Sequence, residues 1–206
     1  MKVFALTLRL FATVIGVPLV VETRPIDEYW QRSTQVGSFQ SAWEAIGQRG
    51  VYYLWFATED LTYDCVTIEV TEAFSDKKTI HYKFRGYNES LKKTKEFEGV
   101  SVVTDDIRGQ GTTLDNSVKE KNERWQSQIV YTEKDSKCFV LYLPKTNVYQ
   151  LWLNKKETRP IPRGCEFAYS LVTYGLNTHV CSYKSICKHV VEDTGNSQAS
   201  LQWASL

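Results

Sequence analysis

Short runs of β-forming residues recur along this chain and set the strongest limit on its fold. Residues 51–56 are six aliphatic or aromatic β-formers in succession, a run too short for a comparable helix. Residues 66–70 and 80–84 alternate apolar and polar side chains, which is the pattern of a half-buried strand. Further candidate strands cover residues 100–103, 125–131, 138–143 and 148–153, and the loop at 108–114 is a candidate for an eighth. This spacing indicates an antiparallel sandwich or a closed barrel, and it does not separate the two.

Helical patterns flank the strands. Residues 38–47 predict a short helix with Ser38 as its N-cap, Gly47 at its end and one apolar face that includes Trp43. Residues 185–191 predict a short C-terminal helix. Residues 165–174 show a mixed pattern, and the charged run at 92–96 is typical of a solvated turn.

The composition excludes two classes of protein. The 206 residues carry 25 basic and 24 acidic side chains, a net charge of +1, so the clustered positive charge of a nucleic-acid-binding protein is missing. Hydrophobic residues make up 42% of the chain, enough apolar surface to offset the entropy of folding, so disorder is excluded as well. One domain is expected at this length.

The first residues predict a signal peptide. Lys2 and Arg9 precede an uncharged stretch at 10–21, and a basic start followed by a short apolar core is typical of secretion. A membrane-spanning helix needs roughly 20 apolar residues, so we expect no membrane span. We therefore expect a signal peptide at 1–21, cleaved within 16–23, and a secreted single domain at 22–206.

Secretion favours disulfides for the cysteines at 65, 138, 165, 181 and 187. They form no CxxC pair, and the three histidines complete no zinc spacing, so no metal site is expected. Two bridges and one free thiol are predicted, and the residues alone leave the connectivity open. Asn88-Glu89-Ser90 is the only N-glycosylation sequon, in a polar, turn-like segment where a glycan would meet solvent.

No catalytic motif is present in the sequence. There is no GxSxG elbow, Walker loop or HExxH, and adjacent acids such as Asp105-Asp106 are better explained as a solvated turn. We therefore expect a protein that is not an enzyme and that needs no cofactor.

Aromatic residues are abundant on the candidate strands. The chain has 6 Trp, 12 Tyr and 9 Phe, and alternate strand positions face inward. Taken one at a time these rings are best explained as a core. As a set with nearby acids they also fit an aromatic cage for an amine or a groove for a lipid tail, because ring faces attract cations and bury apolar area.

Ordered landmarks resemble a known family. Their positions are the Trp-bearing segment 39–43, the Tyr-Tyr segment 51–54, Cys65, the segment 138–144, the Tyr-x-Leu-Trp segment 149–152, Cys165 and a final cysteine. This order resembles the tick salivary lipocalins, the histamine-binding family, over nearly the whole mature chain. The resemblance implies an all-β fold, an eight-stranded antiparallel lipocalin barrel with an N-terminal and a short C-terminal helix. It also implies bridges Cys65–Cys187 and Cys138–Cys165, with Cys181 as the odd thiol.

The resemblance implies that the barrel sequesters a small host mediator. A biogenic amine, histamine or serotonin, is the leading candidate, and a lipid mediator or sterol such as a leukotriene or cholesterol is the alternative. The expected ligand-binding residues are Trp43, Tyr53, Trp55, Glu59, Asp60, Tyr82, Glu98, Trp125 and Gln150. Gln150 and Phe139 stand where the amine-binding pattern has acids, so we expect at most one amine site.

Suppression of host inflammatory and immune defence is the role that this binding implies. A second alternative is an immunomodulatory protein whose surface engages a host immune-cell receptor. We expect a monomer in either case.

Overall fold

The computed structural model describes residues 39–59, 62–105, 111–119, 123–157, 160–176, 180–184 and 186–187. Eight long strands dominate it: β1 (Gly50–Ala57), β2 (Asp64–Phe74), β3 (Thr79–Asn88), β4 (Lys93–Thr104), β5 (Thr113–Val118), β6 (Glu123–Thr132), β7 (Cys138–Leu143) and β8 (Val148–Asn154). The remaining elements are α3 (Ala42–Ile46), α4 (Arg163–Val172), two 3-10 turns, η2 (Lys134–Ser136) and η3 (Lys155–Glu157), and a short strand β9 (Val180–Cys181).

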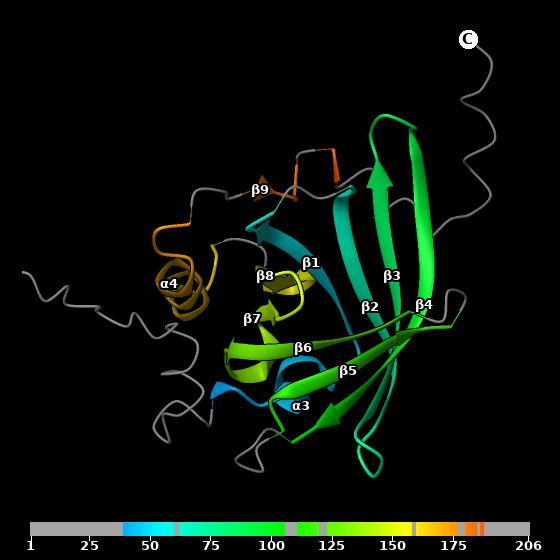
Figure 1. Ribbon diagram of the computed structural model, residues 1–206, viewed down its shortest axis with the longest axis vertical. Coiled ribbons are helices and arrows are strands. Elements are labelled where there is room, and N and C mark those ends of the chain that lie inside the picture. The colour runs from blue at the N-terminus through cyan, green and yellow to red at the C-terminus, as the bar shows by residue number, and fades with distance from the viewer. Residues whose placement is uncertain are drawn as a thin grey trace, which may run out of the picture.

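The eight strands close into an antiparallel barrel. Each strand pairs with the next along the chain, and β1 pairs with both β2 and β8, which joins the two edges of the sheet (Figure 1). β9 adds two residues to β1 outside this ring. The eight-stranded barrel expected from the sequence is confirmed, and closure by β1 decides between the sandwich and the barrel that the spacing left open.

Two strands differ from the sequence prediction. β4 begins at Lys93, so most of the charged run at 92–96 is strand rather than turn. The charges of Lys95 and Glu96 lie on an exposed part of the strand, where Arg85 of β3 pairs with Glu96. The eighth strand, β5, starts at Thr113, at the end of the loop in which we expected it. Polar residues on an exposed part of a strand give the same sequence pattern as a turn, which explains both differences.

Helix α3 closes one end of the barrel. Its N-cap is Ser41, whose Oγ accepts a hydrogen bond from Glu44 N at 3.2 Å. The predicted cap, Ser38, lies outside the described residues. Ala42 N donates to Gly111 O at 2.8 Å and the Ser136 hydroxyl donates to Glu44 O, so the helix is tied to two connections between strands. Ile46 projects into the interior of the barrel.

Helix α4 packs on the outside of the barrel, beside β6, β7 and β8 (Figure 1). Its buried residues are Cys165, Ala168, Tyr169 and Val172, at the three- and four-residue spacings of one helical face. They join a second hydrophobic cluster with Trp55 of β1 and residues of β6 to β8. The sequence pattern of this segment was mixed because its outer face carries Phe167 and Leu171 beside polar residues.

Both expected disulfides are present. Cys65–Cys187 ties the start of β2 to the C-terminal segment, and Cys138–Cys165 ties β7 to α4. Cys181 is free and exposed on β9. The predicted signal peptide and most of the predicted helix at 185–191 lie outside the described residues. Within the described part of the chain, helices are too short and too polar to cross a membrane.

Candidate ligand-binding chamber

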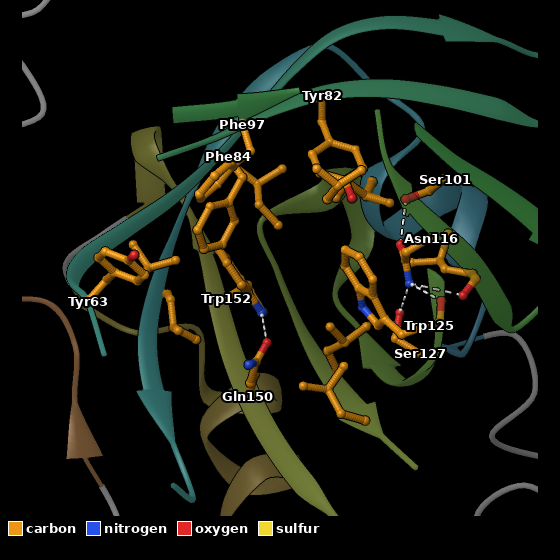
Figure 2. Close-up of a pocket in the computed structure, with 18 of the residues that line it drawn as sticks. Tyr63, Tyr82, Phe84, Phe97, Ser101, Asn116, Trp125, Ser127, Gln150 and Trp152 are labelled. Atoms are coloured by element: carbon orange, nitrogen blue, oxygen red, sulfur yellow. Dashed lines mark hydrogen bonds between the residues drawn. The ribbon is translucent and has the colours of Figure 1, made fainter. Parts of the chain in front are cut away.

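The barrel encloses a cavity of about 470 Å³. This volume lies within the range of small-molecule sites, roughly 300 to 1,000 Å³. Inward-facing residues of all eight long strands line it, and aromatic rings dominate the wall. Six of the rings belong to Tyr63, Tyr82, Phe84, Phe97, Trp125 and Trp152 (Figure 2), and the seventh belongs to Phe139. Apolar side chains such as Val66, Ile68 and Leu141 fill the spaces between them.

The chamber has a closed end and an open end. Ile46 of α3 lies at the closed end. Glu59 follows β1, Tyr63 precedes β2 and Glu123 begins β6, and all three line the cavity at the end of the barrel away from α3. We call this end the mouth. Its two carboxylates are the only ionisable acids in the lining that the structure describes, and that lining contains no Lys, Arg or His.

A buried polar ladder crosses the wall toward the closed end. Ser101 Oγ donates to Asn116 Oδ1 at 2.6 Å, and Asn116 Nδ2 donates to Ser127 Oγ at 2.9 Å (Figure 2). The Tyr82 hydroxyl lies beside the Ser101 side chain, at one end of the ladder (Figure 2). Burial raises the pKa of Tyr82 to about 12, so its hydroxyl stays protonated well above neutral pH. The ladder links β4, β5 and β6 on the inner face of the barrel.

Gln150 and Trp152 form a second polar contact on β8. The Trp152 indole Nε1 donates to Gln150 Oε1 at 3.0 Å, and both side chains are buried (Figure 2). Gln150 pairs with Ala57, two residues before Glu59, so it lies in the half of the chamber nearer the mouth.

The structure brings together four of the expected site residues. Glu59, Tyr82, Trp125 and Gln150 all line the chamber. Asp60 lies outside the described residues.

Four other expected residues do not line the chamber. Glu98 is exposed and pairs with Lys119 at 3.5 Å on the outer face of β4, because its neighbour Phe97 faces inward and successive strand residues alternate. Tyr53 and Trp55 flank the inward-facing Leu54, so they too point out of the barrel. Both rings pack against Tyr183, with centroids 5.0 and 4.7 Å apart.

Trp43 is the fourth residue that lies outside the chamber. It packs on the core from α3, with Lys78 Nζ 4.7 Å from the centre of its ring. It supports the closed end rather than the ligand wall.

Several lining residues were not expected from the sequence. Glu123 and Trp125 are two residues apart on β6 and therefore share its inner face. Strand alternation counted from Trp125 identifies Glu123. No local pattern identifies Asn116 or Ser101, since their roles depend on which strands become neighbours.

These features define a lipocalin-type protein: an antiparallel barrel with a helix at one end and one aromatic chamber that opens at the other. Eight-stranded barrels of this kind can hold one small ligand in their interior. The sequence model of the tick histamine-binding protein family matches residues 30–189. The chain belongs to that family.

Individual relatives agree with this assignment. The male-specific histamine-binding salivary protein of Rhipicephalus appendiculatus is 28% identical over an alignment of 158 residues, and the match covers 67% of this chain and 75% of that protein. Among solved structures, the serotonin complex of AM182 has a TM-score of 0.55 at 15% identity and covers 71% of this chain and 91% of its own. Apocrustacyanin C1 has a TM-score of 0.51 at 15% identity and covers 83% and 93%. The two structures support the fold.

Proposed function

We propose that this protein binds a biogenic amine, histamine or serotonin, in its chamber. The observation that carries the proposal is the charge of the lining. Glu59 and Glu123 face the cavity and no basic side chain does so among the described residues, so the mouth attracts cations. The family and the histamine-binding salivary relative support the same ligand class.

The ammonium group has a suitable site on β6. Glu123 supplies a carboxylate, and Trp125 on the same face supplies an indole ring, the best of the aromatic faces for a cation. Glu59 adds a second negative charge at the mouth. The rings of the wall cover the apolar part of the ligand.

One amine site is proposed. Toward the closed end the lining residues are apolar or belong to the neutral polar ladder, and Phe139 lies among them. A second ammonium placed there would lose its hydration without meeting a carboxylate, at a cost of several kcal/mol.

Titration calorimetry with histamine and serotonin tests this proposal. Glu123→Gln and Glu59→Gln should each weaken binding about fivefold, because each removes a partly screened charge worth roughly 1 kcal/mol, and the double variant more. Glu98→Gln is the matched control: it removes a carboxylate from the outer face of β4, and affinity should not change. Binding that is indifferent to both mouth carboxylates, or two tight sites per chain, contradicts the proposal.

A lipid mediator or sterol is the second candidate ligand. The apolar surface around Phe139, Leu141 and Trp152 favours it, because that part of the chamber contains no charge among the described residues. Native mass spectrometry of secreted protein separates the two: a retained sterol or fatty acid favours the lipid, and amine uptake by an otherwise empty chain favours the amine.

We further propose that the protein acts outside the cell as a monomer, by removing a host mediator and so suppressing inflammatory and immune defence. The salivary relative and the two disulfides support secretion. A role of the outer surface toward an immune-cell receptor remains the alternative, and it predicts activity in a variant whose mouth carboxylates are both neutral.

A further inference from the structure

The orientation of the Gln150 amide is determined by its neighbour. An indole N–H donates a hydrogen bond and cannot accept one. The Trp152 Nε1–H therefore requires the amide oxygen of Gln150, and their distance of 3.0 Å shows this bond in place. The other end of the amide, Nε2, is left as a pure donor.

The Nε2 donor belongs to the chamber. Gln150 lines the cavity, and within the described part of the chain no second hydrogen bond to its side chain is present. Figure 2 shows the Gln150 and Trp152 pair on one side of the chamber, with Trp125 and the polar ladder on the other. A ligand held at Glu123 and Trp125 thus has its ring within a space that Gln150 also borders.

An ammonium group is better matched to the two carboxylates than to Gln150. The Nε2 hydrogens carry partial positive charge, and the neutral amide oxygen already uses one of its two lone pairs to accept from Trp152. An oxygen substituent on the ligand's ring, or the unprotonated nitrogen of an imidazole, can accept a hydrogen bond from Nε2. The two ends of the ligand are thereby distinguished: the cation belongs at the carboxylates and an acceptor belongs at Gln150.

We propose that Gln150 is a specificity-determining residue that selects amines with a hydrogen-bond acceptor on the ring. This inference rests on the proposed amine binding and names the subclass of amine. A site with a hydrogen-bonding group discriminates against an analogue that lacks the partner, because the buried group is then left unpaired. We expect a preference of about tenfold for one such bond.

The test compares three amines that share one ammonium group. Tryptamine has no oxygen on its ring. Serotonin has a hydroxyl group, which can donate or accept a hydrogen bond, and 5-methoxytryptamine has an ether oxygen, which can only accept one. Calorimetry on the full chain should give about tenfold tighter binding of serotonin and 5-methoxytryptamine than of tryptamine. The ratio of affinities cancels the contribution of the shared ammonium group.

Two substitutions assign the preference to Gln150. Gln150→Met removes the donor without adding charge, and the ratio of 5-methoxytryptamine to tryptamine affinity should fall to about one. Gln150→Glu keeps an oxygen for Trp152 and turns a second oxygen toward the chamber, so 5-methoxytryptamine should bind more weakly than tryptamine. Gln126→Glu is the matched control, since Gln126 is exposed on the outer face of β6 and the ratio should not change.

The outcomes separate this inference from the proposed function. Equal binding of the three amines by the unaltered protein, or a preference that survives Gln150→Met in a variant with normal thermal unfolding, overturns the role of Gln150 and leaves amine binding intact. Failure of all three amines and of histamine to bind overturns the proposed function itself.

Discussion

Gly99 makes room for the Tyr82 ring on the inner face of the barrel. A Cβ at Gly99 would lie 2.4 Å from Tyr82 Cζ, inside the van der Waals contact distance. The ring cannot retreat outward through the wall, so a side chain at this position pushes it into the chamber and away from Ser101. The missing side chain thus fixes the position of the Tyr82 ring beside the polar ladder.

Gly99→Ala should therefore destabilise the protein. Overpacking of this kind costs about 1 to 3 kcal/mol of unfolding free energy, measured by urea denaturation. Gly50→Ala is the control, because a Cβ there would lie 3.5 Å from the nearest atom, Asn154 Nδ2, and should change stability by less than about 0.5 kcal/mol. Equal effects of the two substitutions would contradict the packing argument.

Single residues show the limit of prediction from sequence. The inward direction of Trp125 follows from alternation, and so does that of Glu123 once Trp125 is placed. Glu98 is expected in the site from its match to a family landmark, but it lies on the outer face, because a match by position ignores the alternation that sends successive strand side chains to opposite faces. The amide orientation of Gln150 depends on Trp152, two residues away, and follows only from the observed contact.

At the scale of elements, α4 is held on the barrel by a disulfide and by a small apolar face. Cys138–Cys165 spans 27 residues and joins α4 to β7, outside the chamber. The helix contributes four buried residues to the outer cluster. The bridge therefore holds α4 against the outside of the barrel, and neither of its cysteines lines the chamber.

Replacing both Cys138 and Cys165 by Ala should lower the free energy of unfolding by about 3 to 4 kcal/mol in the chain-entropy account of a loop of this length. Amine affinity should change little at temperatures where the variant remains folded. Chemical denaturation and calorimetry measure the two quantities. Cys181→Ser serves as the control, with neither quantity affected, because Cys181 is exposed and unbridged.

Elements were predictable where burial on one side repeats along the chain. β1, β7 and β8 are buried along most of their length and were located within one or two residues. The sequence pattern indicates β4 only from residue 100, because the first residues of the strand are charged and exposed. It does not indicate α4, because the apolar face of that helix consists of only four buried residues. Contacts with neighbouring elements, rather than the local sequence, determine the secondary structure of these two segments: β4 pairs with β3 and β5, and α4 packs on β6 to β8.

The whole molecule should lose stability at alkaline pH. Burial raises the pKa of Tyr82 and of Tyr131 to about 12, and also raises that of Tyr169, from an ordinary value of 10.0. In the unfolded chain these phenols ionise near pH 10, whereas in the folded protein they keep their protons. The stability that they contribute is complete below pH 10 and is lost as the pH rises toward 12.

Urea denaturation at successive pH values between 8 and 12, with tyrosinate absorbance recorded in parallel, measures this loss. Tyr82→Phe should make the decline shallower. A free energy of unfolding that stays constant above pH 10 would contradict the burial of these hydroxyls.

The closed barrel was predictable because strand spacing and the family landmarks agree, and each constrains the whole chain. The chamber's aromatic wall followed from the same alternation. The locations of its charges did not, since they depend on which face each acid occupies and on loops at the mouth.

Because α3 closes one end of the barrel, ligands can enter and leave only through the mouth. With one end of the barrel occupied by Ala42–Ile46 and Ile46 facing inward, a guest leaves by the route through which it entered. Entry and release therefore use the same opening, so a bulky molecule held at the mouth prevents both until it departs.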